Sequence, residues 1–569
     1  MRQRRTGPLI LELDLTEGIA EGPPADPLTA LLTMRKTRLQ DLLEGLRRAA
    51  ADDRVRVLVV KVGGSRIGLA RVQELRAAIG DFRRSGKLAM AWAESFGDFV
   101  HGNVPYYLAT GFDRIYLQPS GTLGLTGVAV EQVFLHGALE KLGIDFEAAK
   151  RHEYKSAPEQ LTESGFTGPA REATARLTES VTEQLAGVVA AGRGLSVERA
   201  TALLGRGPFL APQALAEGLV DGLLYRDQVY EQARKEAGQD ATLLYLQRYQ
   251  RTQSLSDLPR RVGSSVQGMA PGQHERFVAT IYAHGAIRHG RSGRGPGGGG
   301  MGSDTVAAAL RAVGADEGAR AVVLRVNSPG GSYTASDVIW REVVRLRAAG
   351  KPVIISMGDV AASGGYFISA PADVIVVQPG TITGSIGVFM GKPVLRELFG
   401  RAGVTTDSIT DGAGAAIATM FSSSRPFSEA EWARINEWLD AVYADFTQKV
   451  ADGRRLPVER VHELARGRVW TGADALERGL VDELGGLRTA ITRAKVLAGL
   501  EPDADVRLAA YPGSSLMDLL RPKPSSQPAA ASLPEAVGAL IGRSVAGVLS
   551  QAERSLTGAS ALWLGDHRF

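Results

Sequence analysis

Ser363 is the first candidate for chemistry, because it lies in the run Ala-Ala-Ser-Gly-Gly between an expected strand and an expected short helix. Its small neighbours would let a substrate carbonyl approach the hydroxyl, and the free N–H groups of a helix start suit a developing oxyanion. The amide of Gly364 is one donor, and Gly331 or Gly330 in a Pro-Gly-Gly turn could supply the second. This pattern is typical of a nucleophile that attacks a carbonyl group.

A serine nucleophile needs a base, and none of the eight histidines lies in the segments around Ser363 or Ser385, although folding could bring one close. A lysine can serve if burial without a counter-charge lowers its pKa from about 10.4 to about 7–8. Lys155, in the segment Glu-Tyr-Lys-Ser-Ala, is the candidate, and the Ser385 hydroxyl could orient its amine. Glu153 would raise the lysine pKa if it paired with Lys155, so we expect it to point elsewhere.

Each of these residues also fits an ordinary structural role. Ser363 could simply begin a Gly/Ala-rich helix, and Lys155 could be a solvated surface lysine. Ser385 and the pair Gly330 and Gly331 could belong to tight turns. Residue types and spacing alone therefore support a duplicated α/β fold with a plausible serine site, and the roles stay open at this level.

Alternating strand-like and helix-like segments must position these residues. In the second half, 321–326 is rich in β-branched residues, 336–349 has helical spacing that ends at Gly350, and 352–357 is again strand-like. The order strand, helix, strand predicts a layered α/β domain.

The same order of strand-like and helix-like segments occurs twice along the chain. Residues 113–128 resemble residues 373–388, and Gln118 and Gln378 within them are 260 positions apart. Similar segments at nearly constant spacing indicate an internal duplication. The offset pairs the candidate residues with residues that lack their chemistry: Ser363 with Asn103, Gly364 with Val104, Ser385 with Leu125 and Lys155 with Ala415. Each copy has therefore kept half of a site, and the halves must meet in the fold.

We expect a first copy over residues 1–250, a linker over 251–275, a second copy over 276–500 and an extension over 501–569. The extension is expected to be partly disordered, with an apolar helical pattern between Val537 and Leu549. The glycine-rich residues 290–300 predict a flexible loop.

Composition excludes several classes of protein. The 569 residues include no cysteine, so disulfides, cysteine nucleophiles and thiolate metal sites are ruled out. A formal net charge of +4 without a basic stripe argues against a nucleic-acid partner. The apolar start is broken by Glu12 and Asp14, and no run of 18 apolar residues occurs. We therefore expect a chain without signal peptide or membrane span, cytoplasmic or peripheral on the membrane.

Three segments, 153–157, 325–339 and 358–389, resemble the signal peptide peptidase A (protease IV) family in its long, duplicated form, and the likeness spans roughly residues 30–500. The resemblance implies a ClpP/crotonase-type fold, a repeated ββα superhelix, in both copies. It implies Ser363 as nucleophile, Lys155 as general base and Ser385 as the serine that orients the lysine. It also implies a homo-tetramer that cleaves signal peptides and other unstructured apolar peptides and needs no metal or other cofactor. Long members carry a membrane anchor, which is not seen here.

Two other functions are compatible with such a fold. A CoA-thioester enzyme would need a carboxylate near the glycine-rich turns, and the segments 325–334 and 358–370 contain only Asp359. A non-catalytic scaffold descended from a protease is the other alternative, which the joint presence of Ser363, Lys155 and Ser385 disfavours.

Overall fold

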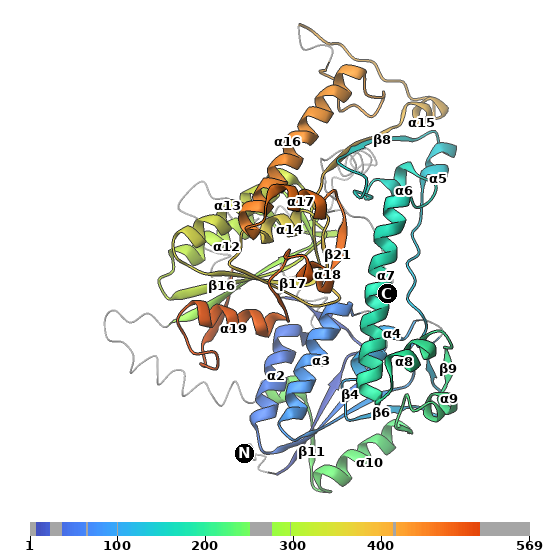
Figure 1. Ribbon diagram of the computed structural model, residues 1–569, viewed down its shortest axis with the longest axis vertical. Coiled ribbons are helices and arrows are strands. Elements are labelled where there is room, and N and C mark those ends of the chain that lie inside the picture. The colour runs from blue at the N-terminus through green and yellow to red at the C-terminus, as the bar shows by residue number, and fades with distance from the viewer. Residues whose placement is uncertain are drawn as a thin grey trace.

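The computed structural model describes residues 7–22, 37–63, 67–98, 101–250, 276–295, 298–412 and 417–511. The chain forms two sheets of mainly parallel strands, one in each half, with helices packed against them (Figure 1). The expected α/β fold of two tandem copies is confirmed.

The first sheet is parallel throughout and follows the order β10–β6–β5–β4–β1–β11. Its strands are β10 (Gly222–Leu223), β6 (Arg114–Leu117), β5 (Leu88–Ala93), β4 (Val55–Lys61), β1 (Leu9–Asp14) and β11 (Thr242–Tyr245). Its helices are α2 (Leu39–Ala51), α3 (Leu69–Arg84), α4 (Asn103–Ala109), α7 (Gly168–Arg193), α8 (Val197–Leu204), α9 (Ala211–Ala216) and α10 (Arg226–Ala237).

The second sheet follows the order β21–β19–β17–β16–β12–β23, and β18 also pairs with β17 and in turn with β22. Its strands are β21 (Val469–Thr471), β19 (Ile382–Gly384), β17 (Val353–Ala362), β16 (Ala319–Ser328), β12 (Phe277–His284), β23 (Arg507–Tyr511), β18 (Val374–Val377) and β22 (Glu483–Leu484). Its helices are α12 (Ser303–Ala315), α13 (Tyr333–Ala348), α14 (Gly364–Ser369), α16 (Glu429–Arg454), α17 (Val458–Leu464), α18 (Gly472–Glu477) and α19 (Leu487–Leu497).

The central strands are apolar because both faces of a parallel sheet are covered. In β16, every residue from Ala321 to Val326 is buried, including Arg325. The following helix, α13, begins where the Ser332 side chain accepts a hydrogen bond from the Ala335 amide, and it ends before Gly350, whose φ is +77°. The elements expected from the sequence here are therefore present, and their bounds differ by a few residues.

The duplication extends to individual hydrogen bonds. The Tyr106 hydroxyl donates to the Leu219 carbonyl at 2.6 Å, and the Tyr366 hydroxyl donates to the Leu480 carbonyl at 2.7 Å. Both tyrosines are buried on the short helix that follows the third strand of their sheet. The two copies therefore share a core arrangement as well as a strand order.

One strand from each copy pairs with the other in a protruding arm. Strand β8 (Asp145–Lys150) of the first copy pairs antiparallel with β20 (Phe389–Val394) of the second. The arm also carries α5 (His136–Lys141), α6 (Glu159–Thr162) and α15 (Arg396–Arg401), at the top of Figure 1. Lys155 follows β8 by five residues, so the arm brings the first copy's candidate base to the second copy.

Charged side chains also join the copies below the arm. The buried Arg325 of β16 forms ion pairs with Glu74 of α3 at 2.5 Å and with Glu21 at 2.6 Å. Arg71 of α3 pairs with Asp359 of β17 at 2.5 Å. Helix α3 therefore packs against the strand that leads to Ser363.

Three short two-stranded pairings and one small sheet complete the described part. The pairings other than β8–β20 are β2 (Ile19–Ala20) with β3 (Thr37–Arg38) and β7 (Thr122–Leu123) with β9 (Phe209–Leu210). The small sheet contains β13 (Ala286–Arg288), β15 (Gly298–Gly302) and β14 (Gly293–Gly295). Across residues 7–511, outside the gaps given above, no helix has the length and apolar character needed to cross a bilayer.

Part of the stretch 290–300, expected as a flexible loop, has strand structure, because Gly293–Gly295 forms β14 and β15 begins at Gly298 and pairs with it. The parallel edge offered by β13 explains the difference, since glycine-rich backbone can approach it closely. Strand β23 places residues 507–511, part of the expected extension, in the second sheet. The linker 251–275 and the helical pattern 537–549 lie outside the described residues.

Candidate active site

Ser363 lies at the junction of β17 and α14 with an unusual backbone. Its φ of 53° and ψ of −118° are rare for a residue with a side chain, and such strained conformations cluster at functional sites. The Ser363 amide donates to the Gly384 carbonyl at 2.8 Å, which ties the strained residue to β19. The equivalent residue of the first copy, Asn103, does not have a positive φ.

Lys155 of the first copy meets Ser363 and Ser385 of the second. Its Nζ lies 3.1 Å from the Ser363 Oγ, 3.0 Å from the Ser385 Oγ and 3.1 Å from the Ser385 carbonyl oxygen. The three residues that the sequence singled out are thus brought together from segments more than 200 positions apart. An amine held between two hydroxyls can take a proton from one while the other fixes its direction.

The Lys155 side chain is buried away from solvent. Its side chain is 1% exposed, and burial lowers the pKa of Lys155 to about 7, with no charged group contributing. Glu153 forms its ion pair with Arg466, as expected, and so leaves the amine without a counter-charge. At neutral pH a large share of the amine is therefore unprotonated and able to act as a base.

Two backbone amides lie near each other beside Ser363. Within the described residues, neither the Gly364 amide nor the Gly331 amide donates a hydrogen bond. A methyl group built on Gly364 would lie 3.1 Å from the Gly331 nitrogen, so the two amides are close neighbours. The Gly330 amide, in contrast, donates to the Ser328 hydroxyl at 3.1 Å. Gly364 and Gly331 therefore suit an oxyanion better than Gly330 does.

The histidine alternative finds no support in the described part of the chain. There the only side chain that hydrogen-bonds the Ser363 hydroxyl is Lys155. The nearest histidine in sequence to the lysine, His152, instead packs its ring against Tyr443 and His462.

The corresponding place in the first copy has lost the chemistry. The Asn103 side chain accepts from the Thr126 amide at 3.0 Å, and Leu125 is fully buried where the second copy has Ser385. Ala415, which the offset pairs with Lys155, lies outside the described residues.

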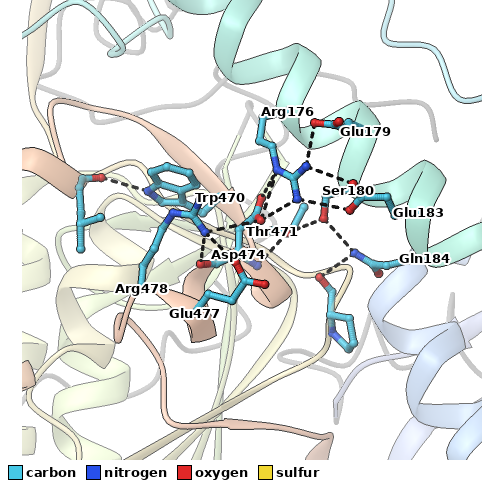
Figure 2. A network of polar contacts seen from close by, with 12 residues as sticks. Arg176, Glu179, Ser180, Glu183, Gln184, Trp470, Thr471, Asp474, Glu477 and Arg478 are labelled. Carbon is cyan, nitrogen blue, oxygen red and sulfur yellow. Dashed lines mark hydrogen bonds and ion pairs between the residues drawn. The ribbon is translucent and has the colours of Figure 1, made fainter. Parts of the chain in front are cut away.

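Helix α7 holds the first copy against the strand next to β19. Figure 2 shows Arg176 reaching from α7 to Asp474 of α18, at 2.9 Å, and Ser180 meeting Thr471 of β21, at 2.9 Å. Gln184 of α7 donates to the Pro379 carbonyl at 3.2 Å. These contacts join α7 to the residues just before β19 and to its neighbouring strand β21, so α7 connects the first copy to the strands beside Ser385.

Sequence reasoning missed one element of this site. Residues 466–468, between α17 and β21, contact the backbone on both sides of the lysine pocket. The run Arg-Gly-Arg is too short and too common to have been recognised, and only the positive φ angles of Arg466 and Gly467 set it apart.

Comparisons with known proteins agree with the duplication. The family model described as Peptidase family S49 matches two regions, residues 82–240 and 345–501. The chloroplastic serine protease SPPA of Arabidopsis thaliana is 30% identical over 85% of this chain and 69% of its own length. Protease 4 of Salmonella typhi is 32% identical over 82% and 73%, and Protease 4 of Haemophilus influenzae is 30% identical over 83% and 75%. A solved membrane-bound stomatin-specific protease shares 16% identity, with a TM-score of 0.26 over 42% of this chain and all of its own.

Proposed function

Because the chain belongs to peptidase family S49, we propose that it is a serine endopeptidase in which Ser363 is the nucleophile and Lys155 is the general base. One observation carries the assignment. A fully buried lysine without a charged partner lies 3.1 Å from a serine hydroxyl whose backbone is strained. Burying an amine in this way costs stability, and such a cost is typical of functional sites.

In the proposed mechanism, the Ser363 Oγ bonds to the substrate carbonyl carbon as its proton moves to the Lys155 Nζ. The amides of Gly364 and Gly331 stabilise the oxyanion, each contributing roughly 2.7–4 kcal/mol to the transition state. The C–N bond then breaks, and Lys155 returns the proton to the leaving amine. In the second half, water gives a proton to Lys155 and attacks the ester, and Ser363 leaves as its hydroxyl is reprotonated. Ser385 keeps the amine aimed throughout.

We propose released signal peptides and other unstructured, apolar peptides as substrates. The burial of Ser363, which is 0% exposed, supports this class, because an extended peptide needs a smaller opening to reach a recessed hydroxyl than a folded protein surface does. The family resemblance supports the apolar preference. Neither a bound CoA group nor a purely structural role would account for the contact between Lys155 and Ser363.

The test is hydrolysis of an unstructured apolar peptide by the full chain and by two variants, Ser363→Ala and Lys155→Ala. Lys141→Ala is the matched control, because that lysine is exposed on α5. We expect both site variants to lose activity while folded and the control to keep it. An active Lys155→Ala variant would overturn the base assignment, and a wild-type chain inert on many peptides would favour the scaffold alternative.

We also propose that the chain assembles with copies of itself, in the number of four that the resemblance implies. The internal offset supports this proposal. It pairs β20 with residues 129–134 and β8 with residues 405–410, and in the described residues neither of these equivalents has a strand partner. Both carry exposed apolar side chains, with Val133 68% and Ile409 99% exposed.

The pairing that β8 makes with β20 inside one chain would then be repeated between chains, with residues 405–410 of one chain beside residues 129–134 of the next chain. Such a head-to-tail contact generates a ring if the rotation closes. The same register would place Ile409 opposite Val130, as Ala149 is opposite Met390. Because the chain has no cysteine, the pair Ile409→Cys and Val130→Cys gives a clean disulfide test.

We expect oxidation to yield covalent species of up to four chains, and sedimentation to give a tetramer. The control pair is Ile409→Cys with Val496→Cys, since Val496 is exposed on α19 of the second copy. A monomer by sedimentation, or equal cross-linking by both pairs, would contradict the proposed assembly.

A further inference from the structure

The turn formed by Arg466, Gly467 and Arg468 lies between the backbone next to Lys155 and the backbone of Ser385. It joins α17 to β21, and both Arg466 (φ 54°) and Gly467 (φ 85°) have left-handed backbones. It makes no contact with the Ser363 hydroxyl, so its effect on chemistry must pass through Lys155 and Ser385.

Three backbone hydrogen bonds tie this turn to the site. The Arg466 carbonyl accepts from the Tyr154 amide at 3.1 Å, directly before Lys155. The Arg468 carbonyl accepts from the Ser385 amide at 2.7 Å. Between them, the Gly467 amide donates to the carbonyl of Ile386 at 2.8 Å. One turn therefore spaces the lysine backbone from the backbone of Ser385, whose hydroxyl and carbonyl oxygens accept hydrogen bonds from the lysine amine.

Gly467 fits against the lysine with no room to spare. A methyl group on this glycine would lie 2.4 Å from the Lys155 nitrogen and 2.6 Å from its Cα and Cβ. Distances below about 3 Å are not tolerated between such atoms, so any side chain at this position must push the Lys155 backbone away.

The Arg468 side chain braces the same segment from outside. Its guanidinium donates to Glu172 of α7 at 2.7 Å and lies 4.8 Å from the centre of the Tyr154 ring. The Tyr154 hydroxyl donates to the other oxygen of Glu172 at 2.8 Å. Arg468 therefore links α7 of the first copy to Tyr154, beside the lysine, and through its carbonyl to Ser385.

We propose that the Arg466–Arg468 turn is the positioning element of the dyad, with Gly467 and Arg468 as positioning residues that set the distance between the Lys155 amine, Ser385 and Ser363. The inference rests on the proposed function, because positioning matters to catalysis only if Lys155 is the base. It adds that the second copy supplies the support for the first copy's lysine.

The test compares Gly467→Ala with Gly479→Ala. Gly479 also has a left-handed backbone (φ 72°), but a methyl group there meets its nearest neighbour at 3.9 Å. The control therefore reproduces the backbone strain of alanine without the collision at Lys155. We expect Gly467→Ala to lower kcat roughly 100-fold with little change in KM, because misplacement of a reacting group by about 1 Å has an effect of that size. We expect the control to stay within about twofold of wild type.

Two further readouts separate positioning from mere folding. The midpoint of the rising limb of the pH–rate profile should move upward in Gly467→Ala, because a displaced lysine loses part of its enclosure. Competitive labelling of Lys155 with acetic anhydride, followed by peptide mass spectrometry, reports the same midpoint without any turnover. If Gly467→Ala does not fold, Arg468→Lys replaces it, because lysine keeps the charge and loses the planar contact with Tyr154. A few-fold lower kcat with the same upward midpoint shift is then expected.

Equal kcat and equal labelling midpoints for Gly467→Ala and Gly479→Ala would overturn the inference even in an active peptidase. If Gly467→Ala does not fold, a wild-type kcat and midpoint in Arg468→Lys would overturn it as well. If the wild-type chain cleaves no peptide but the midpoint of Lys155 still shifts between the two alanine variants, the proposed function fails and the positioning of the amine stands.

Discussion

The enclosure of Lys155 can be tested by placing one negative charge inside it. The variant Ser385→Asp puts a carboxylate where a hydroxyl lies 3.0 Å from the Nζ. The matched control, Ser385→Asn, has nearly the same shape without the charge. Both variants lose the serine hydroxyl, and both tolerate the left-handed backbone that Ser385 adopts, with φ 51°.

The expected size of the effect follows from the geometry. Two unit charges about 4 Å apart attract by about 4 kcal/mol at an effective dielectric constant of about 20. That energy corresponds to roughly three pKa units, so the pKa of Lys155 would return from about 7 to roughly 10. At pH 7.5 the share of neutral lysine then falls from about three quarters to below about 1%, which predicts a rate roughly 100-fold lower.

The assay is kcat/KM for an unstructured apolar peptide between pH 6 and pH 10.5. In the Ser385→Asp variant we expect low activity at neutral pH that recovers to within a few-fold of the Ser385→Asn control near pH 10. The control should keep a rising limb near pH 7, at a lower plateau. Superimposable profiles for the two variants would refute the idea that a neutral Lys155 is the base.

Three other outcomes follow from the described contacts. The unfolded chain carries Lys155 with a pKa of 10.5 and the folded chain with one of about 7, so the wild type binds fewer protons when folded and gains stability as pH rises between these values. Urea unfolding should therefore show Lys155→Met more stable relative to wild type at pH 7 than at pH 11, by about 4 kcal/mol. Tyr106→Phe and Tyr366→Phe should each lower the free energy of unfolding by about 1–3 kcal/mol, because each leaves an equivalent buried carbonyl unpaired. Introducing Asn103→Ser and Leu125→Ser into Ser363→Ala should restore no peptidase activity, because Ala415 offers no amine at the matching position.

The fold was predictable because its signals are local and repeated. Strands such as β16 are continuous apolar runs, helices such as α13 end at a glycine, and the 260-residue offset relates one copy to the other. The strands within the stretch 290–300 were not predicted, because their pairing involves β13, which lies outside that stretch.

The sequence named the three residues that meet at the candidate site, but it named little of their support. Comparison of the two copies singled out Ser363 and Ser385, Lys155 was the candidate base, and the resemblance assigned their roles. The contacts of Gly467 with Lys155, and of Arg468 with Glu172, join segments roughly 300 positions apart and leave no periodic pattern. Likewise, nothing in the sequence distinguishes the free amide of Gly331 from the engaged amide of Gly330.

The arm carries the lysine of one half to the serine of the other, so the proposed mechanism makes peptidase activity dependent on the completed chain. The first copy alone has no serine hydroxyl for its lysine to activate, because Asn103 occupies that position, and its lysine lacks the support of the second copy. Ser363 is made some 200 residues later and stays a poor nucleophile until both sheets have formed and docked through β8 and β20. In the proposed mechanism neither half of the chain holds both members of the dyad, so the hydrolytic group forms only when the two copies have docked.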